Sequence, residues 1–167
     1  AYGSSYSSFS FQVIDNGSNA NGGVVIDPSP NTITIDVTPV SDAPSGSNNT
    51  VSVLEDGIKA FTSADFGFSD PTDTGSDLDT LAAVRIASLP LNGTLQYNGN
   101  TITQAQINAG FDVTAADLAN AKLTFSPALN AYGSSYSSFS FQVIDNGSNA
   151  NGGVVIDPSP NTITIDV

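Results

Sequence analysis

Apolar and polar residues alternate over short stretches of this chain, which is typical of strands with one buried face. Between residues 8 and 14, for example, Phe9, Phe11 and Val13 share one face and serines and glutamine occupy the other. The same pattern predicts further strands at residues 23–26, 32–37, 50–54, 81–87, 94–97, 101–103 and 122–125, and again within 138–167.

Turn signals separate these stretches, and helix signals are few. Asn98-Gly99 predicts a two-residue hairpin turn, and residues 27–31 are expected to turn the chain between strands 23–26 and 32–37. Residues 114–121 predict one short capped helix, and residues 62–65 predict a 3₁₀ turn. The prediction is an all-β fold, an antiparallel β-sandwich with one or two short helical turns.

Residues 1–37 recur letter for letter as residues 131–167. Such identity indicates a recently duplicated tandem array, so we expect the natural protein to be longer. Residues 1–37 are too few to hold a core alone without disulfides or metal, and the chain has no Cys. We therefore expect 1–37 to be the C-terminal part of a preceding repeat, 38–44 a stiff proline-containing connector, and 45–167 a full repeat. Alternatively, residues 1–37 complete a split domain with residues 43–130.

The charge is strongly negative: 16 acidic residues against three basic ones give a net charge of −13. Glu55 is the single Glu, so almost all of the acidic residues are Asp, which suits turns and hard-cation binding equally well. The absence of a basic patch argues against nucleic acid as a partner, and no apolar run predicts membrane insertion. An exported domain without Cys fits a bacterial surface protein.

Three carboxylates continue an inward apolar column by one step. Asp15 follows Phe9, Phe11 and Val13; Glu55 follows Val51 and Val53; Asp70 follows Phe66 and Phe68. Because side chains alternate along a strand, each carboxylate is expected at the rim of the core, where it needs a counter-charge or a metal.

The loop 70–79 adds four carboxylates in ten residues, and Asp15-Asn16-Gly17 and its copy at Asp145 add oxygen-rich turns. Three basic residues cannot pair with all of these acids, whereas calcium takes six to eight oxygen ligands. The alternative is that the same Asp and Asn residues simply form turns. The residue pattern thus makes Asp15, Glu55, Asp70, Asp73, Asp77 and Asp145 candidate calcium ligands.

The order of several motifs resembles the cadherin-like and CSPG-type tandem repeats of giant bacterial RTX adhesins. The motifs are Val53-Leu-Glu-Asp-Gly57, Phe66-Gly-Phe-Ser-Asp-Pro-Thr-Asp73, Leu89-Pro-Leu-Asn-Gly-Thr-Leu-Gln-Tyr-Asn-Gly99, Leu123-Thr-Phe-Ser-Pro127, Phe141-Gln-Val-Ile-Asp-Asn-Gly147 and the connector Thr38-Pro-Val-Ser-Asp-Ala-Pro44. The resemblance covers nearly all of residues 38–167. It implies an Ig/cadherin-like sandwich that acts as a calcium-rigidified extender at the bacterial cell surface.

The resemblance also implies where calcium binds, and it adds Asp42 and Asp56 to the candidate calcium ligands. Glu55 and Asp42 match the acidic positions after the first strand and in the connector, and Asp70 and Asp73 resemble an Asp-x-Asp pair with one extra residue between them. Asp15 from the preceding repeat would join these four at one junction. Asp145 would then belong to the junction with a following repeat, and neighbouring repeats would be the partners of an otherwise monomeric fragment.

Enzyme activity is not expected. Asp73-Thr74-Gly75 is the aspartic-protease tripeptide, but it has no second copy and no apolar strand before it, and the chain has no His for serine catalysis. The competing hypothesis is a module that binds a carbohydrate or a protein, for which exposed aromatics among Tyr2, Tyr6, Tyr132 and Tyr136 would be the evidence.

Overall fold

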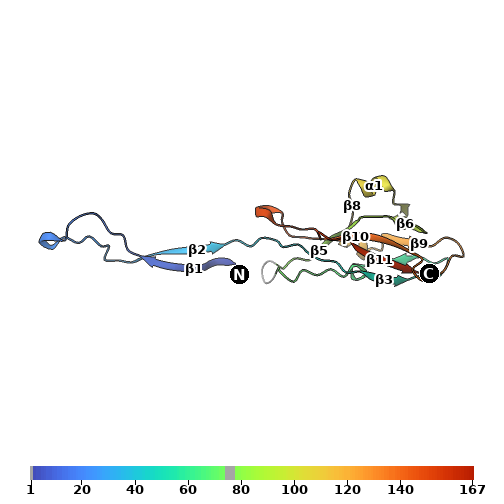
Figure 1. The fold of residues 1–167 in the computed structure, drawn as a ribbon, viewed down its shortest axis with the longest axis horizontal. Coiled ribbons are helices and arrows are strands. Elements are labelled where there is room, and N and C mark those ends of the chain that lie inside the picture. The colour runs from blue at the N-terminus through green and yellow to red at the C-terminus, as the bar shows by residue number, and fades with distance from the viewer. Residues whose placement is uncertain (1, 74–77) are drawn as a thin grey trace. The chain divides into compact units, whose positions relative to one another are not determined.

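The computed structural model describes residues 2–73 and 78–167, and the chain divides into two compact units, Ala1–Pro39 and Val40–Val167. The first, which we call the hairpin unit, pairs β1 (Gly3–Phe11) with β2 (Asn31–Val37) in an antiparallel two-stranded ribbon (Figure 1). A 3₁₀ turn, η1 (Ala20–Gly22), lies between the strands. Each unit is described on its own below.

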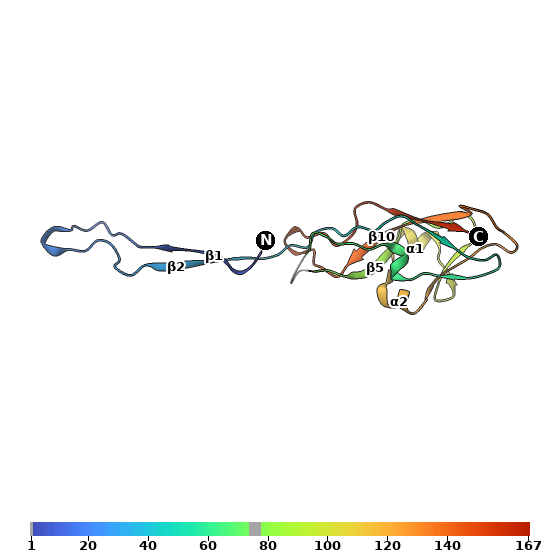
Figure 2. The same cartoon turned by 90° about the horizontal axis from the view of Figure 1, so that it is seen from below.

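The second unit, which we call the sandwich unit, contains a five-stranded and a four-stranded sheet. The strand orders are β3-β11-β10-β5-β8 and β4-β9-β6-β7, and β10 lies beside β5 (Figure 2). All pairs are antiparallel except β3 with β11, which is parallel. The strands are β3 (Asn49–Ser52), β4 (Lys59–Ala60), β5 (Leu81–Ile86), β6 (Thr94–Tyr97), β7 (Asn100–Thr101), β8 (Phe111–Thr114), β9 (Leu123–Ser126), β10 (Ser137–Asp145) and β11 (Asn161–Asp166). The predicted all-β fold is confirmed.

Short helical segments connect the strands. Two are 3₁₀ turns, η2 (Ser63–Phe66) and η4 (Ala150–Gly152), and two are single-turn helices, α1 (Gln104–Asn108) and α2 (Ala115–Ala119). Thr103 and Gln106 form a reciprocal cap at the start of α1, and the Thr114 hydroxyl accepts a hydrogen bond from the Asp117 N–H at the start of α2. These caps satisfy amide groups that a helix this short cannot satisfy itself.

Five buried phenylalanines fill the space between the two sheets: Phe61, Phe66, Phe125, Phe139 and Phe141. The Phe139 ring meets Phe61 edge-on at 5.3 Å between centroids, and Phe141 meets Phe66 edge-on at 4.9 Å. Edge-to-face pairs add to the free energy that burial of the rings contributes. The second copy of the repeated segment, which supplies β10 and β11, is therefore the copy that completes this core.

Several local predictions differ from the structure. Residues 23–26 are not a strand, because Ile26 makes only a single bridge to Ile14, and β2 pairs with β1 instead. Positive φ at Asn21 and Gly22 turns the chain just before this segment and shortens its pairing. The sequence prediction also missed β4, β8 and α1, which are two, four and five residues long, too short for a clear periodicity.

Candidate metal centre

Three aspartates converge at one end of the sandwich unit. Asp70, Asp73 and Asp79 each place one carboxylate oxygen within 4.8 Å of the others. Asp70 and Asp73 follow the bridge between Ser69 and Ser45, and Asp79 lies just before β5. Asp73 is only 2% exposed. Like charges this close repel one another when they are partly removed from water, and a cation held between them would offset that repulsion.

Asp145 lies next to these three aspartates, since their charges act on its carboxylate. It is the last residue of β10, on the inward face after Phe139, Phe141 and Val143, and it is 3% exposed. Burial is the main cause that raises the pKa of Asp145 to about 6; a hydrogen bond from the Gly147 N–H lowers it, and the charges of Asp79, Asp70 and Asp73 raise it further. We call Asp70, Asp73, Asp79 and Asp145 the acidic cluster.

Two oxygens of the acidic cluster are buried without a hydrogen-bond partner among the described residues: Asp70 Oδ2 and Asp145 Oδ2. Burial is also the main cause that raises the pKa of Asp70 above its usual range. A hydrogen bond from the Asp73 N–H lowers this pKa, and the negative charges of Asp73 and Asp79 raise it. A buried carboxylate oxygen without a partner is costly, and a bound cation would remove that cost.

The three basic side chains of the protein, all within the described residues, do not serve the acidic cluster, since each pairs with another aspartate. Lys59 pairs with Asp65 at 3.0 Å, Arg85 with Asp112 at 2.7 Å, and Lys122 with Asp117 at 2.6 Å. The counter-charge of the cluster must therefore come from solution, as a bound cation, a proton or diffuse ions.

The connector is tied to the acidic cluster. The Ser41 hydroxyl donates to Asp79 Oδ2 at 3.1 Å, and the Asp42 N–H donates to Asp73 Oδ2 at 2.9 Å. A Cβ added at Gly147 would overlap Ser41 Oγ and Asp79 Oδ2, so a larger residue there would displace these two side chains. Three segments that are distant in sequence thus meet at this end of the unit: the connector, the loop before β5 and the end of β10.

The structure brings together three of the eight candidate ligands, Asp70, Asp73 and Asp145. Asp42 contributes its backbone N–H, while its side chain is exposed. Asp77 lies outside the described residues. Asp145 lies beside Asp70 and Asp73 in the same unit, which differs from the expected assignment to a following repeat.

The other three candidates lie away from the acidic cluster. Glu55 and Asp56 follow β3 at the opposite end of the sheet, near Val167, and Asp56 accepts a hydrogen bond from the Asn130 N–H at 2.8 Å. Strand β3 ends at Ser52, so the alternation that was expected to carry Glu55 inward stops before it and Glu55 is exposed. Asp15 belongs to the hairpin unit, where it is exposed and accepts a hydrogen bond from the Gly17 N–H.

Two residues were missing from the candidate set, Asp79 and Ser41. The sequence held a signal for Asp79, because it lies in the acidic loop two residues before a predicted strand that starts at Leu81. In the structure Leu81 pairs with Asp145 in the sheet, which brings the start of β5 next to the end of β10. The pairing of β5 with β10 cannot be read from either strand alone.

The acidic cluster offers only oxygen ligands, which suits a hard cation such as Ca²⁺ or Mg²⁺ better than zinc or copper. The carboxylates of Asp70, Asp73 and Asp79 carry six oxygens, and the Asp145 carboxylate and the Ser41 hydroxyl lie beside them, which matches the six to eight oxygens that Ca²⁺ takes. Mg²⁺ demands near-ideal octahedral geometry and usually keeps several waters, so it gains less from such a carboxylate-rich site.

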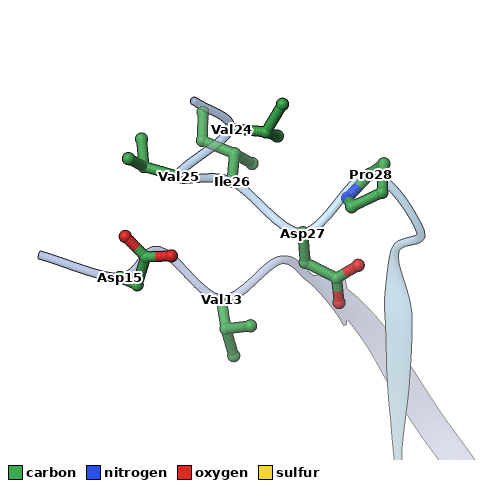
Figure 3. Close-up of a pocket in the computed structure, with 7 residues that line it drawn as sticks. All are labelled: Val13, Asp15, Val24, Val25, Ile26, Asp27 and Pro28. Carbon is green, nitrogen blue, oxygen red and sulfur yellow. The ribbon is translucent and has the colours of Figure 1, made fainter. Parts of the chain in front are cut away.

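A second concave site lies on the hairpin unit, lined by Val13, Asp15 and residues 24–28 (Figure 3). The carboxylate of Asp27 points away from Asp15 and accepts hydrogen bonds from the Ser29 N–H and the Asn31 amide. The lining is mostly apolar and holds no third carboxylate, so this site does not resemble a metal centre.

The tyrosines whose exposure would favour a binding module differ in burial. Tyr6 and Tyr132 are exposed, whereas Tyr136 packs against the core and accepts a hydrogen bond from the Ala128 N–H. They do not form a shared exposed surface within the sandwich unit.

Comparison with known proteins adds no relative: no family model, curated protein or solved structure matches this chain. Among the described residues no helix has the length and apolar character needed to cross a membrane.

Proposed function

We propose that the sandwich unit is a calcium-binding extender module of a bacterial cell-surface adhesin, repeated in tandem to project a distal ligand-binding region. The observation that carries the calcium part is the convergence of three carboxylates with Asp145 beside them, in which Asp70 and Asp145 each have a buried oxygen without a hydrogen-bond partner among the described residues. The exact recurrence of residues 1–37 supports the tandem array, because a spacer needs uniform units.

A cation in the acidic cluster would stiffen the start of the module. Asp73 and Asp79 already hold the connector through the Asp42 N–H and the Ser41 hydroxyl. Neutralising these carboxylates would remove the repulsion among Asp70, Asp73, Asp79 and Asp145. The connector would then be held rigidly at the start of the module, which would restrict the angle between successive repeats.

Calcium removal tests this proposal on the whole chain. With calcium at about a hundred times its Kd, we expect the melting temperature to be roughly 10 °C higher than in EDTA, because a ligand that binds only the folded state stabilises it. Titration calorimetry should show calcium binding that magnesium at equal concentration does not reproduce.

The two copies of the repeat provide a matched control. Asp145→Asn removes a cluster carboxylate, and we expect it to weaken calcium binding at least tenfold. Asp15→Asn makes the same change in the same local sequence but in the hairpin unit, and should leave binding and melting unchanged. A chain with no heat of calcium binding and the same melting curve in EDTA would refute the proposed function.

A further inference from the structure

The two identical copies of the repeated segment have opposite environments. Phe9 is 51% exposed and Phe11 is 36% exposed, whereas their counterparts Phe139 and Phe141 are 1% and 0% exposed. The same contrast holds for Val13 against Val143, and for Ile33 and Ile35 against Ile163 and Ile165. The same apolar face is therefore exposed in the first copy and buried in the second copy.

The structure shows what covers this face in the second copy. Strand β5 pairs along β10, with Ile86 opposite Phe141, and β3 pairs along β11, with Val51 opposite Ile165. The rings of Phe61 and Phe66 close the face from the other layer, at 5.3 Å from Phe139 and 4.9 Å from Phe141. All of these covering residues lie between Val40 and Asn130.

The first copy already has the shape of the docked one. Phe9 is opposite Ile33 and Phe11 is opposite Asn31, in the same register as Phe139 opposite Ile163 and Phe141 opposite Asn161. The β1–β2 sheet has only two strands, so among the described residues both of its outer edges, the ones that β5 and β3 occupy in the second copy, lack a strand partner. An apolar face with two open edges is a surface prepared for strand addition.

We propose that the β1–β2 hairpin of one molecule docks onto residues 40–130 of a second copy of this chain and replaces that copy's own β10–β11 hairpin. The incoming hairpin can make the same strand pairs and ring packing as the hairpin it displaces, because the two have the same sequence. Residues 1–167 hold two such hairpins and one set of covering residues, so in a chain of these residues one hairpin is left over and the exchange can continue head to tail.

The covalent attachment of the β10–β11 hairpin to its own core determines the conditions under which the exchange can be detected. A molecule's own β10–β11 hairpin is covalently attached to residue 130, which gives it a millimolar effective concentration over a hairpin from another molecule. The intact chain is therefore monomeric when dilute. Weakening the attached hairpin alone shifts the competition toward the hairpin of the second copy.

Paired substitutions in the whole chain test the proposal. Phe141→Ala damages the attached hairpin and leaves β1–β2 intact, so we expect concentration-dependent oligomers by analytical ultracentrifugation. In dilute solution its melting temperature should fall by roughly 10 °C, and part of that loss should be recovered at high concentration.

Phe11→Ala alone should melt like the unmodified chain. The double variant F11A/F141A should lose both the oligomers and the recovery. Phe141→Leu, a milder change, serves the same purpose where Phe141→Ala does not fold.

Three results would overturn the proposal. One is identical behaviour of the Phe141 variants with and without Phe11→Ala. Another is a recovery that depends on Phe11 but not on concentration, since the hairpin would then dock within its own molecule. The last is oligomer formation by the unmodified chain to the same extent as by the Phe141 variants, which would indicate that exposed hairpins pair with each other.

Discussion

At the scale of single residues, strand parity placed Asp15, Glu55 and Asp70 at the rim of the core, and the structure leaves Asp15 and Glu55 exposed and Asp70 partly buried. The same column in the second copy, Phe139, Phe141, Val143 and Asp145, keeps strict alternation to the end of β10, so Asp145, the counterpart of Asp15, is buried. The equivalent argument for Glu55 was wrong because β3 ends early. Parity holds only while the strand continues, and the sequence around Val53 does not mark the strand's last residue.

The raised pKa of Asp145 predicts how the calcium-free protein responds to pH. A folded pKa of about 6, above the usual 3.8, means that the folded state holds the proton more tightly than the unfolded state. This stabilisation is complete below about pH 3.8 and is lost as pH rises through about 6, and Asp70 shifts in the same direction. We expect the free energy of unfolding in calcium-depleted buffer to fall by roughly 1–3 kcal/mol between pH 4 and pH 7.

Urea unfolding at several pH values checks this expectation. Asp145→Asn should flatten the slope. The low pKa of Asp117, about 2 because of its bonds to Lys122, Tyr97 and Thr114, affects stability only at more acidic pH and does not mask the result. Stability that rises from pH 4 to pH 7 without calcium would contradict the burial of these carboxylates.

At the scale of elements, the sequence predicted those with strong local signals. The strands 32–37, 81–87 and 94–97, the turn at Asn98-Gly99 and the helix beginning at Thr114 are all present within a residue or two. The elements that were missed, β4, β8 and α1, are defined by their neighbours in the sheet and by a cap rather than by periodicity. The parallel pairing of β3 with β11 also has no signal in the local sequence, because it depends on the path of the whole chain.

Two glycines beside the β6–β7 hairpin separate backbone strain from packing. Both have positive φ, +76° at Gly93 and +77° at Gly99. A Cβ at Gly93 would overlap the Phe125 ring, whereas a Cβ at Gly99 would meet nothing within 4 Å. We expect Gly99→Ala to cost about 1 kcal/mol of unfolding free energy, and Gly93→Ala about 2–4 kcal/mol. Equal losses in chemical denaturation would show that Phe125 does not pack on Gly93.

At the scale of the whole molecule, identical sequence does not ensure identical stability. The second copy lies in the middle of a five-stranded sheet, and the first is an isolated hairpin, which is marginal in water. The sequence could reveal the duplication and its lack of an independent core. From the sequence we expected residues 45–167 to form the full repeat, but the split domain of residues 1–37 with 43–130 remained an alternative, because both copies carry the same residues.

Hydrogen exchange can measure this difference in one experiment. Peptides cut from within the two copies have the same mass, so each should appear as one peptide with two isotope envelopes of equal area. We expect the β1–β2 envelope to exchange at least about a thousandfold faster than the β10–β11 envelope, because the latter opens only with the core. A single slow envelope would mean that the first copy is also protected.

The parallel pairing of β3 with β11 has a mechanical consequence. These neighbouring strands are the first and the last of the sandwich unit, so the chain arrives ahead of β3 and departs after β11. Tension on both ends pulls the two strands in opposite directions along their common axis. The pairs from Asn49 opposite Ile163 to Ser52 opposite Asp166 are then loaded together, in shear, instead of parting one after another. When the module is pulled from its two ends, the hydrogen bonds between β3 and β11 therefore resist the force together, in the geometry in which a sheet is hardest to separate.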